Sequence, residues 1–212
     1  MVREGYVFAA PPLLAGLALL ALNRFVFGQA TWLNWLAGIS IFLGAFVLYF
    51  FRDPQRVIPE DPAAVVSPAD GRVVEIVDEA WEGKPGRRIS IFLSVWDVHI
   101  QRAPVAGTIR QVDYRPGKFY AALRARASVE NEQNVIRIAT PRGEMMFKQI
   151  AGWIARRVVS WKAAGDAVTR GERVGMIRFG SRVDVWLPPE AAIAVRKGQH
   201  VAGGSDILAR WP

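Results

Sequence analysis

The stretch Ser67-Pro68-Ala69-Asp70-Gly71-Arg72-Val73 decides the fold, because the chain repeats its pattern as Ala103-Pro104-Val105-Ala106-Gly107-Thr108-Ile109. In each copy a proline and a glycine precede a β-branched residue, which is typical of a turn that leads into a strand. A second pattern, Val-x-x-Gly-x-x-Val, occurs at residues 168–174 and again at 195–201. Glycine supplies the positive φ angles that tight turns between short strands need. The two repeated patterns therefore predict a compact, mainly β domain.

These repeats resemble the half-motifs of lipoyl- and biotinyl-type domains, and that resemblance implies a β sandwich or barrel. Short apolar stretches separated by glycine or proline continue through the rest of the domain, as strands require. The expected strands are residues 65–66, 72–77, 89–95, 108–112, 135–139, 144–149, 174–177 and 183–187. A short helix is expected at 120–127, and residues 152–161 suit either a helix or a strand.

The first 51 residues form a separate apolar segment, in which Arg3, Glu4 and Arg24 are the charged residues. Within it, residues 6–22 and 25–51 are uncharged runs of 17 and 27 residues. A helix that crosses a bilayer needs about 20 apolar residues. We therefore expect an N-terminal α-helical membrane hairpin at 1–51 rather than a cleaved signal peptide, with a turn near 28–31. The sequence leaves open whether this hairpin spans the bilayer or lies shallowly in it.

The hairpin is followed by a proline-rich linker at 52–63, and the β domain occupies residues 64–212. Arg52 and Arg56 come directly after the apolar segment, and Arg3 precedes it. Because basic flanking segments tend to stay on the cytoplasmic side, we expect a protein of the cell (inner) membrane. Its β domain would then lie on the cytoplasmic side.

The chain is basic, since 27 Lys and Arg residues against 19 Asp and Glu residues give a net charge of +8. Nucleic acid and anionic membranes both attract such a chain. No nucleic-acid motif accompanies the charge, so membrane lipids are the expected partner and nucleic acid is not. A lipid-facing basic surface is expected from Arg124, Arg126, Arg156 and Arg157. With no cysteine and two histidines, the chain has no disulfide framework, and we expect no metal site.

Three residues could together perform nucleophilic chemistry. Ser181 follows Gly180 at a tight junction between two strand patterns, and His99 is one of the two histidines. Asp70 lies in a Pro-x-Asp-Gly turn. Serine is a poor nucleophile until a base takes its proton and a third group orients that base. The residues alone leave open an ordinary turn at 180–181, a turn cap at Asp70 and a structural histidine.

The chain resembles the phosphatidylserine decarboxylase proenzymes of the short, bacterial and archaeal type. Five segments carry the resemblance in order along the chain. They are residues 51–54 (Phe-Arg-Asp-Pro), 67–71 (Ser-Pro-Ala-Asp-Gly), 97–107 (Asp-Val-His through Ala-Pro-Val-Ala-Gly), 128–134 (Ser-Val-Glu-Asn-Glu-Gln-Asn) and 179–181 (Phe-Gly-Ser).

The resemblance implies a self-cleaving enzyme with a pyruvoyl cofactor. Ser181 would attack the carbonyl of Gly180, and β-elimination of the resulting ester would split the chain into β (1–180) and α (181–212) chains. Ser181 would become the pyruvoyl group, which forms a Schiff base with phosphatidylserine and yields phosphatidylethanolamine. By the same analogy His99 deprotonates Ser181 and Asp70 orients His99. The two chains would stay together as a heterodimer, with further dimerisation left open.

Two positions depart from the family pattern. The family often has Leu-Gly-Ser-Thr at the cleavage site, where this chain has Phe-Gly-Ser-Arg. Larger relatives carry His-x-x-His-x-Pro, where this chain has Arg102 in place of the second histidine. This leaves open whether His99 serves cleavage, decarboxylation or both. Arg102, Asn131 and Asn134 are the expected substrate-binding residues, with a plain surface position for Arg102 left open.

Two other functions fit parts of the sequence. A membrane-anchored, non-enzymatic adaptor would need only the lipoyl-like repeats. A membrane-anchored Ser-His-Asp hydrolase would use the same three residues, although the chain lacks the Gly-x-Ser-x-Gly motif of that class. Both alternatives predict a chain that stays in one piece.

Overall fold

The computed structural model describes residues 1–28, 30–124, 126–153, 157–178 and 180–212. Within them the chain divides into two compact units, Met1–Pro54 and Gln55–Pro212. Three residues of the sequence analysis lie outside the described residues. They are Phe179 of the Phe-Gly-Ser motif, Arg156 of the expected basic surface and Gln29 of the expected hairpin turn. Each unit is described by itself below.

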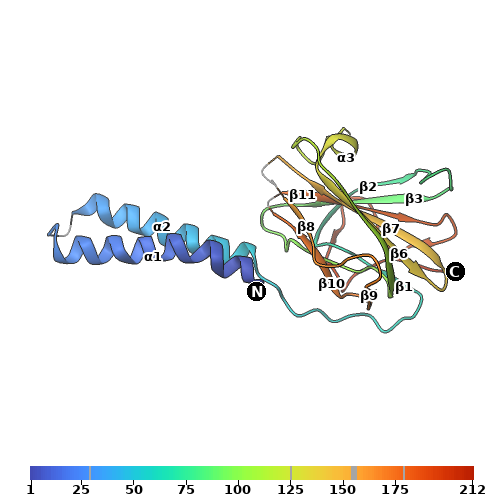
Figure 1. Ribbon diagram of the computed structural model, residues 1–212, viewed down its shortest axis with the longest axis horizontal. Coiled ribbons are helices and arrows are strands. Elements are labelled where there is room, and N and C mark those ends of the chain that lie inside the picture. Colours follow the sequence, from blue (N-terminus) through green and yellow to red (C-terminus); the bar gives the residue numbers. More distant parts are fainter. Residues whose placement is uncertain (29, 125, 154–156, 179) are drawn as a thin grey trace. The chain divides into compact units, whose positions relative to one another are not determined.

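The first unit is a pair of antiparallel helices, α1 (Arg3–Phe25) and α2 (Thr31–Phe50), which Figure 1 shows side by side. Glycine lets them approach closely, since a Cβ on Gly44 would lie 2.5 Å from Cγ of Leu13. Ser40 Oγ donates a hydrogen bond of 2.7 Å to the carbonyl of Pro12, within the proline pair of α1. Small residues and hydroxyl groups at a helix contact are typical of apolar surroundings.

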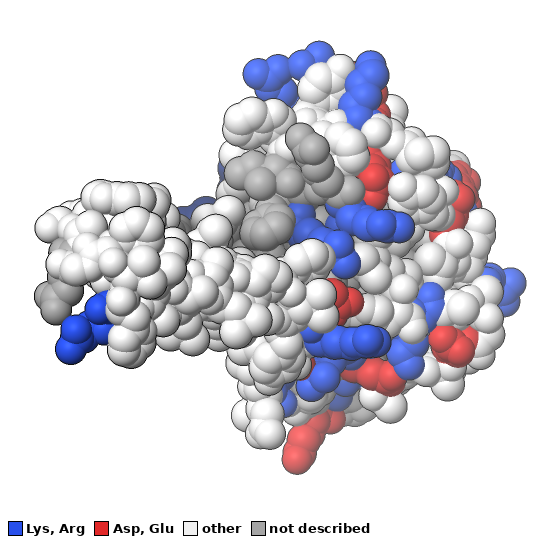
Figure 2. Space-filling view, turned by 60° about the vertical axis from the view of Figure 1, so that its left-hand side comes forward, with Lys and Arg blue, Asp and Glu red and all other residues white. Residues whose placement is uncertain are grey.

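Both helices are long and apolar enough to cross a membrane. Figure 2 shows this unit almost free of Lys, Arg, Asp and Glu, in contrast to the mixed charges of the β domain. The expected apolar helices are therefore present, and they favour association with a membrane.

The second unit is built almost entirely of antiparallel strands (Figure 1). Its largest sheet has eight strands in the order β13-β2-β3-β11-β7-β6-β5-β9, and two three-stranded sheets have the orders β1-β14-β12 and β4-β10-β8. One short helix, α3 (Ala127–Glu130), lies between β5 and β6. The strands are β1 (Ala64–Val66), β2 (Gly71–Asp78), β3 (Arg87–Leu93), β4 (Ile100–Arg102), β5 (Gly107–Arg115), β6 (Gln133–Thr140), β7 (Gly143–Ala151), β8 (Val158–Ser160), β9 (Ala167–Val168), β10 (Arg173–Ile177), β11 (Ser181–Leu187), β12 (Ala192–Ile193), β13 (His200–Val201) and β14 (Ile207–Arg210).

Strand β11 lies in the middle of the large sheet, between β3 and β7. Its alternate residues Val183, Val185 and Leu187 pack into the main hydrophobic core. Arg182, Asp184 and Trp186 occupy the other positions of the strand and are buried as well. Because successive side chains of a strand point to opposite faces, both faces of the sheet are covered at β11.

The repeated sequence patterns correspond to a repeated arrangement of strands. Gly71 and Gly107 each begin a strand, and a Cβ on either would lie 2.2–2.3 Å from a carbonyl oxygen of the next strand. The segments that precede them are held alike, because Gly204 N–H donates to Ser67 O and Gly171 N–H donates to Ala103 O. In the structure, residues 201–204 therefore correspond to residues 168–171. The sequence pattern had instead paired 168–171 with 195–198, six residues earlier in the chain.

The prediction of a mainly β chain with two N-terminal helices is confirmed, and all eight expected strands are present. The helix expected at 120–127 is wrong, because the chain makes turns there and α3 begins only at Ala127. The undecided stretch 152–161 contains the short strand β8. The lipoyl-like character of the sandwich stays a prediction.

Candidate active site

The three residues expected to perform chemistry lie at one end of the large sheet. Ser181 is the first residue of β11 and is in register with Leu93 and Ala151, the last residues of β3 and β7. His99 lies in the segment that follows β3, and Asp70 immediately precedes β2. The strand order therefore gathers residues from three distant parts of the sequence at the end where β11 begins.

The bond between Gly180 and Ser181 lies where the chain enters this central strand. Ser181 is fully buried, and its Oγ accepts or donates no hydrogen bond among the residues that the structure describes. Because a buried hydroxyl normally has a partner, this unpartnered Oγ makes Ser181 a candidate for a reaction or for contact with a ligand. Gly180 has a φ angle of +51°, a conformation that residues with a Cβ rarely adopt.

Gly152 provides the space for the carbonyl group of Gly180. A Cβ added to Gly152 would lie 2.1 Å from Gly180 O and 3.0 Å from Gly180 C. Only a residue without a side chain fits against this carbonyl. Gly152 follows Ala151, the partner of Ser181 on β7, so the sheet itself brings the two backbones together. Sequence reasoning missed Gly152, whose importance appears only in three dimensions.

His99 is buried, and its ring is oriented by the main chain. Its Nδ1 lies 2.9 Å from the carbonyl oxygen of Asp97. Since a carbonyl oxygen only accepts hydrogen bonds, Nδ1 carries the proton of the neutral ring and Nε2 keeps the basic lone pair. The His99 carbonyl accepts the N–H of Ile177, four residues before Ser181. His99 is thereby fixed beside the strand that leads to the Gly180–Ser181 bond.

Asp70 is buried but is bonded to groups other than His99. Arg56 NH2 lies 2.8 Å from Oδ1 and 2.7 Å from Oδ2 of Asp70, and Gly203 N–H donates to Oδ1 over 2.8 Å. Among the residues that the structure describes, no hydrogen bond joins Asp70 to His99. In this arrangement the carbonyl of Asp97, rather than the carboxylate of Asp70, sets the orientation of the imidazole.

Asp97 links the histidine segment to the C-terminal part of the chain. Its carboxylate accepts hydrogen bonds from Ser94 N–H, Ser94 Oγ and His200 Nε2, each 2.8 Å long. Burial raises the pKa of Asp97, but the bonds from Ser94 and His200 outweigh it and hold that pKa below its ordinary value. Asp97 is therefore an ionised anchor for the turn that presents His99.

A chain of buried amides continues from His99 across the sheet. Gln101 Nε2 donates to His99 O, and Gln149 Nε2 donates to Gln101 Oε1 over 2.9 Å. Asn134 Nδ2 approaches Gln149 Oε1 at 3.4 Å. These fully or nearly buried groups rigidify the backbone at His99. Gln101 and Gln149 carried no signal in the sequence, because single glutamines inside strands are common.

The three expected substrate-binding residues are tied into the structure. Arg102 donates to Gly171 O, and the Asn131 side chain makes three hydrogen bonds, to Tyr120 N–H, Tyr120 O and Ala151 O. Asn131 thus holds the 116–130 loop against the end of β7. Asn134 is part of the amide chain, although its Oδ1 is buried without a partner among the described residues. Their role in substrate binding stays a prediction.

A layer of buried charges covers the other face of β11. Arg182 bonds both oxygens of Asp184 at 2.7 Å, and Arg88 lies 3.9 Å from Asp184. Lys148 of β7 is in register with Asp184 of β11. Burial lowers the pKa of Lys148, and the charge of Asp184 only partly opposes that effect. Beside this layer is a polar cavity of about 310 Å³, whose lining includes Arg88 and Arg182.

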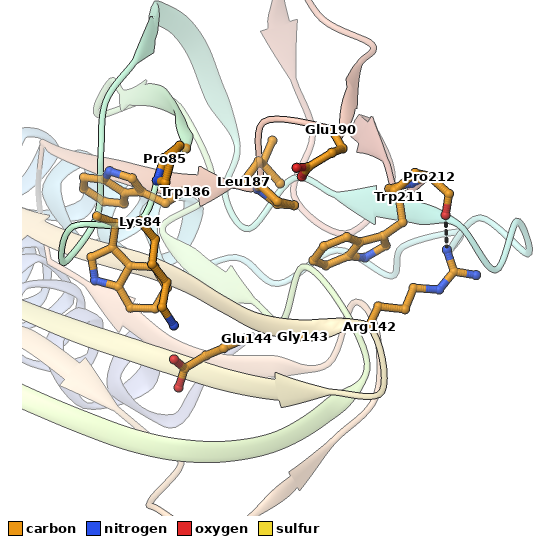
Figure 3. A pocket seen from close by; sticks show the side chains of 13 residues that line it. Lys84, Pro85, Arg142, Gly143, Glu144, Trp186, Leu187, Glu190, Trp211 and Pro212 are labelled. Atoms are coloured by element: carbon orange, nitrogen blue, oxygen red, sulfur yellow. Dashed lines mark hydrogen bonds between the residues drawn. The ribbon is translucent and has the colours of Figure 1, made fainter.

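A second cavity, of about 410 Å³, lies at the opposite end of β11, where Leu187 and Pro188 are among its lining residues. Figure 3 shows Trp186 and Trp211 around it, with Arg142 donating a hydrogen bond to the carbonyl of Pro212. Ser181 and Leu187 are the first and last of the seven residues of β11, and an extended strand of that length spans roughly 20 Å. This apolar cavity is thus remote from the Gly180–Ser181 bond.

Comparison with known proteins found similar sequences over most of the chain. The family model described as "Phosphatidylserine decarboxylase" matches residues 43–209. A "Phosphatidylserine decarboxylase proenzyme" of Solibacter usitatus is 52% identical over 181 residues, covering 83% of this chain and 86% of the relative. Proteins of the same description from Symbiobacterium thermophilum and Burkholderia cenocepacia are 42% and 43% identical, and cover 100% and 99% of this chain and 96% and 95% of their own lengths.

The lowered pKa of Asp97 gives a pH-dependent prediction. Asp97→Asn should lower the unfolding free energy at pH 7 by about 1–2 kcal/mol, because charge-assisted bonds to Ser94 and His200 are lost. A carboxyl whose folded pKa is depressed stabilises fully above its unfolded pKa of about 4 and loses that contribution as the pH falls through the folded value. The difference in Tm between the native chain and the variant should therefore shrink on acidification.

The matched control is Asp78→Asn, because the side chain of Asp78 is 83% exposed and pairs with Arg87 at the surface. Its Tm should follow that of the native chain throughout the titration. An Asp97→Asn variant as stable as the native chain at pH 7 would contradict the role of Asp97 as an ionised anchor.

Proposed function

The chain belongs to the phosphatidylserine decarboxylase family, and we propose that it makes a pyruvoyl cofactor by breaking its own Gly180–Ser181 bond. As a member of that family the protein is a decarboxylase. It removes the carboxylate of the phosphatidylserine headgroup as CO2 and leaves phosphatidylethanolamine. The proenzyme name of its relatives implies processing of the chain. The observation that carries the assignment of the bond is the buried Ser181 Oγ without a partner, next to a glycine in a left-handed conformation.

The proposed cleavage is an N-to-O acyl shift followed by elimination. Ser181 Oγ attacks the Gly180 carbonyl carbon, His99 Nε2 takes the hydroxyl proton, and the Ser181 nitrogen receives a proton as the C–N bond breaks. Elimination of the ester then releases Gly180 as a carboxylate and leaves a dehydroalanine at position 181. Addition of water and loss of ammonia convert that residue to the pyruvoyl group.

The residues of this chain fit such a group. The Ser181 side chain is fully buried, which keeps bulk water from its Oγ, and the Gly180 carbonyl lies against Gly152, which has no side chain. When present, a pyruvoyl carbonyl accepts the electron pair that remains when CO2 leaves. His99, with its lone pair on Nε2, is the proposed carrier of the proton for both cleavage and decarboxylation.

The two products of cleavage are proposed to stay together as an αβ heterodimer. The α chain would contain β11, which pairs along its length with β3 on one side and β7 on the other. It would also contain β13 and β14, which pair with β2 and β1. Each pairing joins the 181–212 segment to the β chain through backbone hydrogen bonds, so cutting one peptide bond removes none of them.

The location at the inner membrane, with the β domain in the cytoplasm, is also a proposal. Two apolar helices precede the domain, and Arg52 and Arg56 follow them. The substrate resides in a membrane by its chemistry, so anchoring the enzyme there raises the frequency of encounter. Basic residues next to the apolar segment favour the cytoplasmic side.

Replacement of the proposed cofactor precursor gives the first prediction. Ser181→Ala should leave the chain in one piece and without decarboxylase activity, because no hydroxyl attacks the Gly180 carbonyl. Gel electrophoresis and release of CO2 from phosphatidylserine measure the two effects. Ser205→Ala, another serine of the 181–212 segment, is the control and should be cut normally. A Ser181→Ala protein that decarboxylates at the native rate would refute the proposal.

The role of the histidine is tested by the rate of processing. His99→Ala should slow self-cleavage by about 10²–10⁴-fold, the usual contribution of a general base. The control is His200→Ala, because His200 is the second histidine, its side chain is 57% exposed and it bears on the site only through its bond to Asp97, so any effect on cleavage should be far smaller. Rates follow from the loss of full-length chain after synthesis in a cell-free system. Normal cleavage and turnover in His99→Ala would reject the assignment.

The fit of Gly152 against the scissile carbonyl gives a third prediction. Gly152→Ala should slow self-cleavage by about tenfold or more, since small displacements of reacting groups are costly. Gly107→Ala is a matched control, because its Cβ would also lie 2.3 Å from a strand carbonyl, that of Ala139, far from Ser181. Both variants should lose similar stability. Equal processing in the two would show that Gly152 serves only the packing of the sheet.

A further inference from the structure

The exposed apolar side chains of the β domain are concentrated around the candidate active site. Five large ones form what we term the rim, and they lie at the end of the sheet where β11 begins. Two others, Val57 and Trp161, lie elsewhere in the described part of Gln55–Pro212. The rim consists of Trp96, Tyr114, Leu123, Val129 and Trp153.

Strand register explains why these residues share one end. Trp96 follows β3, and Trp153 follows β7, the two strands whose last residues pair with Ser181. Leu123 and Val129 belong to the connection between β5 and β6, which leaves the sheet at the Arg115–Gln133 pair. Tyr114 precedes that pair by one residue. The rim therefore lies around the first residue of β11, and none of its residues takes part in the proposed reaction.

The degree of exposure is unusual for such side chains. Trp153 is 75% exposed and Val129 is 77% exposed. Single exposed apolar residues are common on soluble proteins, but a cluster of them next to a site marks a surface that meets a partner. Tryptophan and tyrosine in particular are enriched where protein meets the headgroup region of a bilayer.

The charges around the rim are mostly positive. Of the acidic residues next to the rim in the sequence, Asp113 and Glu130 form ion pairs with Arg115 and Lys118, and Asp97 is bonded to His200. Three exposed arginines from the same connections form no ion pair among the described residues, and one of them, Arg126, stacks over the ring of Tyr120 at 3.7 Å. They are Arg124, Arg126 and Arg157. Exposed aromatic and aliphatic groups combined with arginine suit an anionic lipid surface.

We propose that the rim docks the β domain onto the surface of an anionic bilayer, with the start of β11 facing the lipid headgroups. This inference rests on the proposed function for the identity of the substrate. The rim partitions into the interfacial layer, the arginines contact lipid phosphates, and a headgroup reaches the site while its acyl chains stay in the membrane. The contact is separate from the N-terminal helices, because every residue of the rim belongs to the β domain.

The test compares one substrate chemistry in two physical forms. The full chain is reconstituted into phosphatidylcholine vesicles, with either long-chain phosphatidylserine in the same bilayer or short-chain phosphatidylserine dissolved as monomers. The variant combines Val129→Gln with Trp153→Gln. Its kcat/KM should fall about tenfold or more for the bilayer substrate, as expected for loss of two apolar anchors. For the dissolved substrate kcat/KM should stay within about twofold of the native value.

Trp161→Gln is the matched control, since this exposed tryptophan lies outside the rim, and it should leave both activities unchanged. Equal losses on the two substrates would overturn the inference, because the residues would then act on folding or chemistry. No loss on the bilayer substrate would overturn it as well. A native chain inactive on both substrates would instead refute the proposed function, so the two failures are distinguishable.

Discussion

The pairing of β11 with both β3 and β7 is the constraint on which the rest of the structure depends. It fixes Ser181 at the level of Leu93 and Ala151, and it brings the ends of three strands together at one place. Because the strand is buried on both faces, its first residue cannot move without disturbing the core on one side and the Arg182–Asp184 pair on the other. The Ser181 hydroxyl and the Gly180 carbonyl that it is proposed to attack are thereby held in a nearly fixed geometry.

The same constraint reconciles cleavage with stability. A chain that cuts itself loses the entropic advantage of a covalent connection, so the free end must be retained by other interactions. Strand 181–187 is central rather than at an edge, and the segments that follow it pair with β1 and β2. Gly180 has a positive φ angle and its carbonyl lies close to Gly152, and both features are accommodated by glycine.

Much of this architecture could be predicted from the sequence, and the exceptions have physical causes. The repeated turn-and-glycine patterns indicated a β domain, and five ordered motifs indicated the family, which excludes the adaptor and hydrolase alternatives. The two-residue strands such as β9 and β13 were missed, because so few residues show no periodicity. Gly152, Gln101 and Gln149 were missed because their significance is a contact between distant segments.

The partner of Asp70 is another feature that sequence order could not reveal. Its place in the chain order Asp70, His99, Ser181 suggested a triad, but the structure pairs its carboxylate with Arg56 and orients His99 through the Asp97 carbonyl. A triad is defined by geometry, which residue spacing does not determine. Orientation of a histidine by a backbone carbonyl leaves no trace in residue types, because every residue carries a carbonyl group.

The most direct test of self-cleavage is the intact mass of the purified protein. Cleavage at Gly180–Ser181 predicts two fragments, residues 1–180 and 181–212, and an N-terminus on the smaller one that resists Edman degradation and reacts with a hydrazide. Reductive amination with cyanoborohydride and an amine should replace the ketone oxygen, which leaves as water, and raise the mass of the smaller fragment alone by that of the amine less one oxygen atom. An active preparation that contains only the unbroken chain of 23.5 kDa would contradict a cofactor made by self-cleavage.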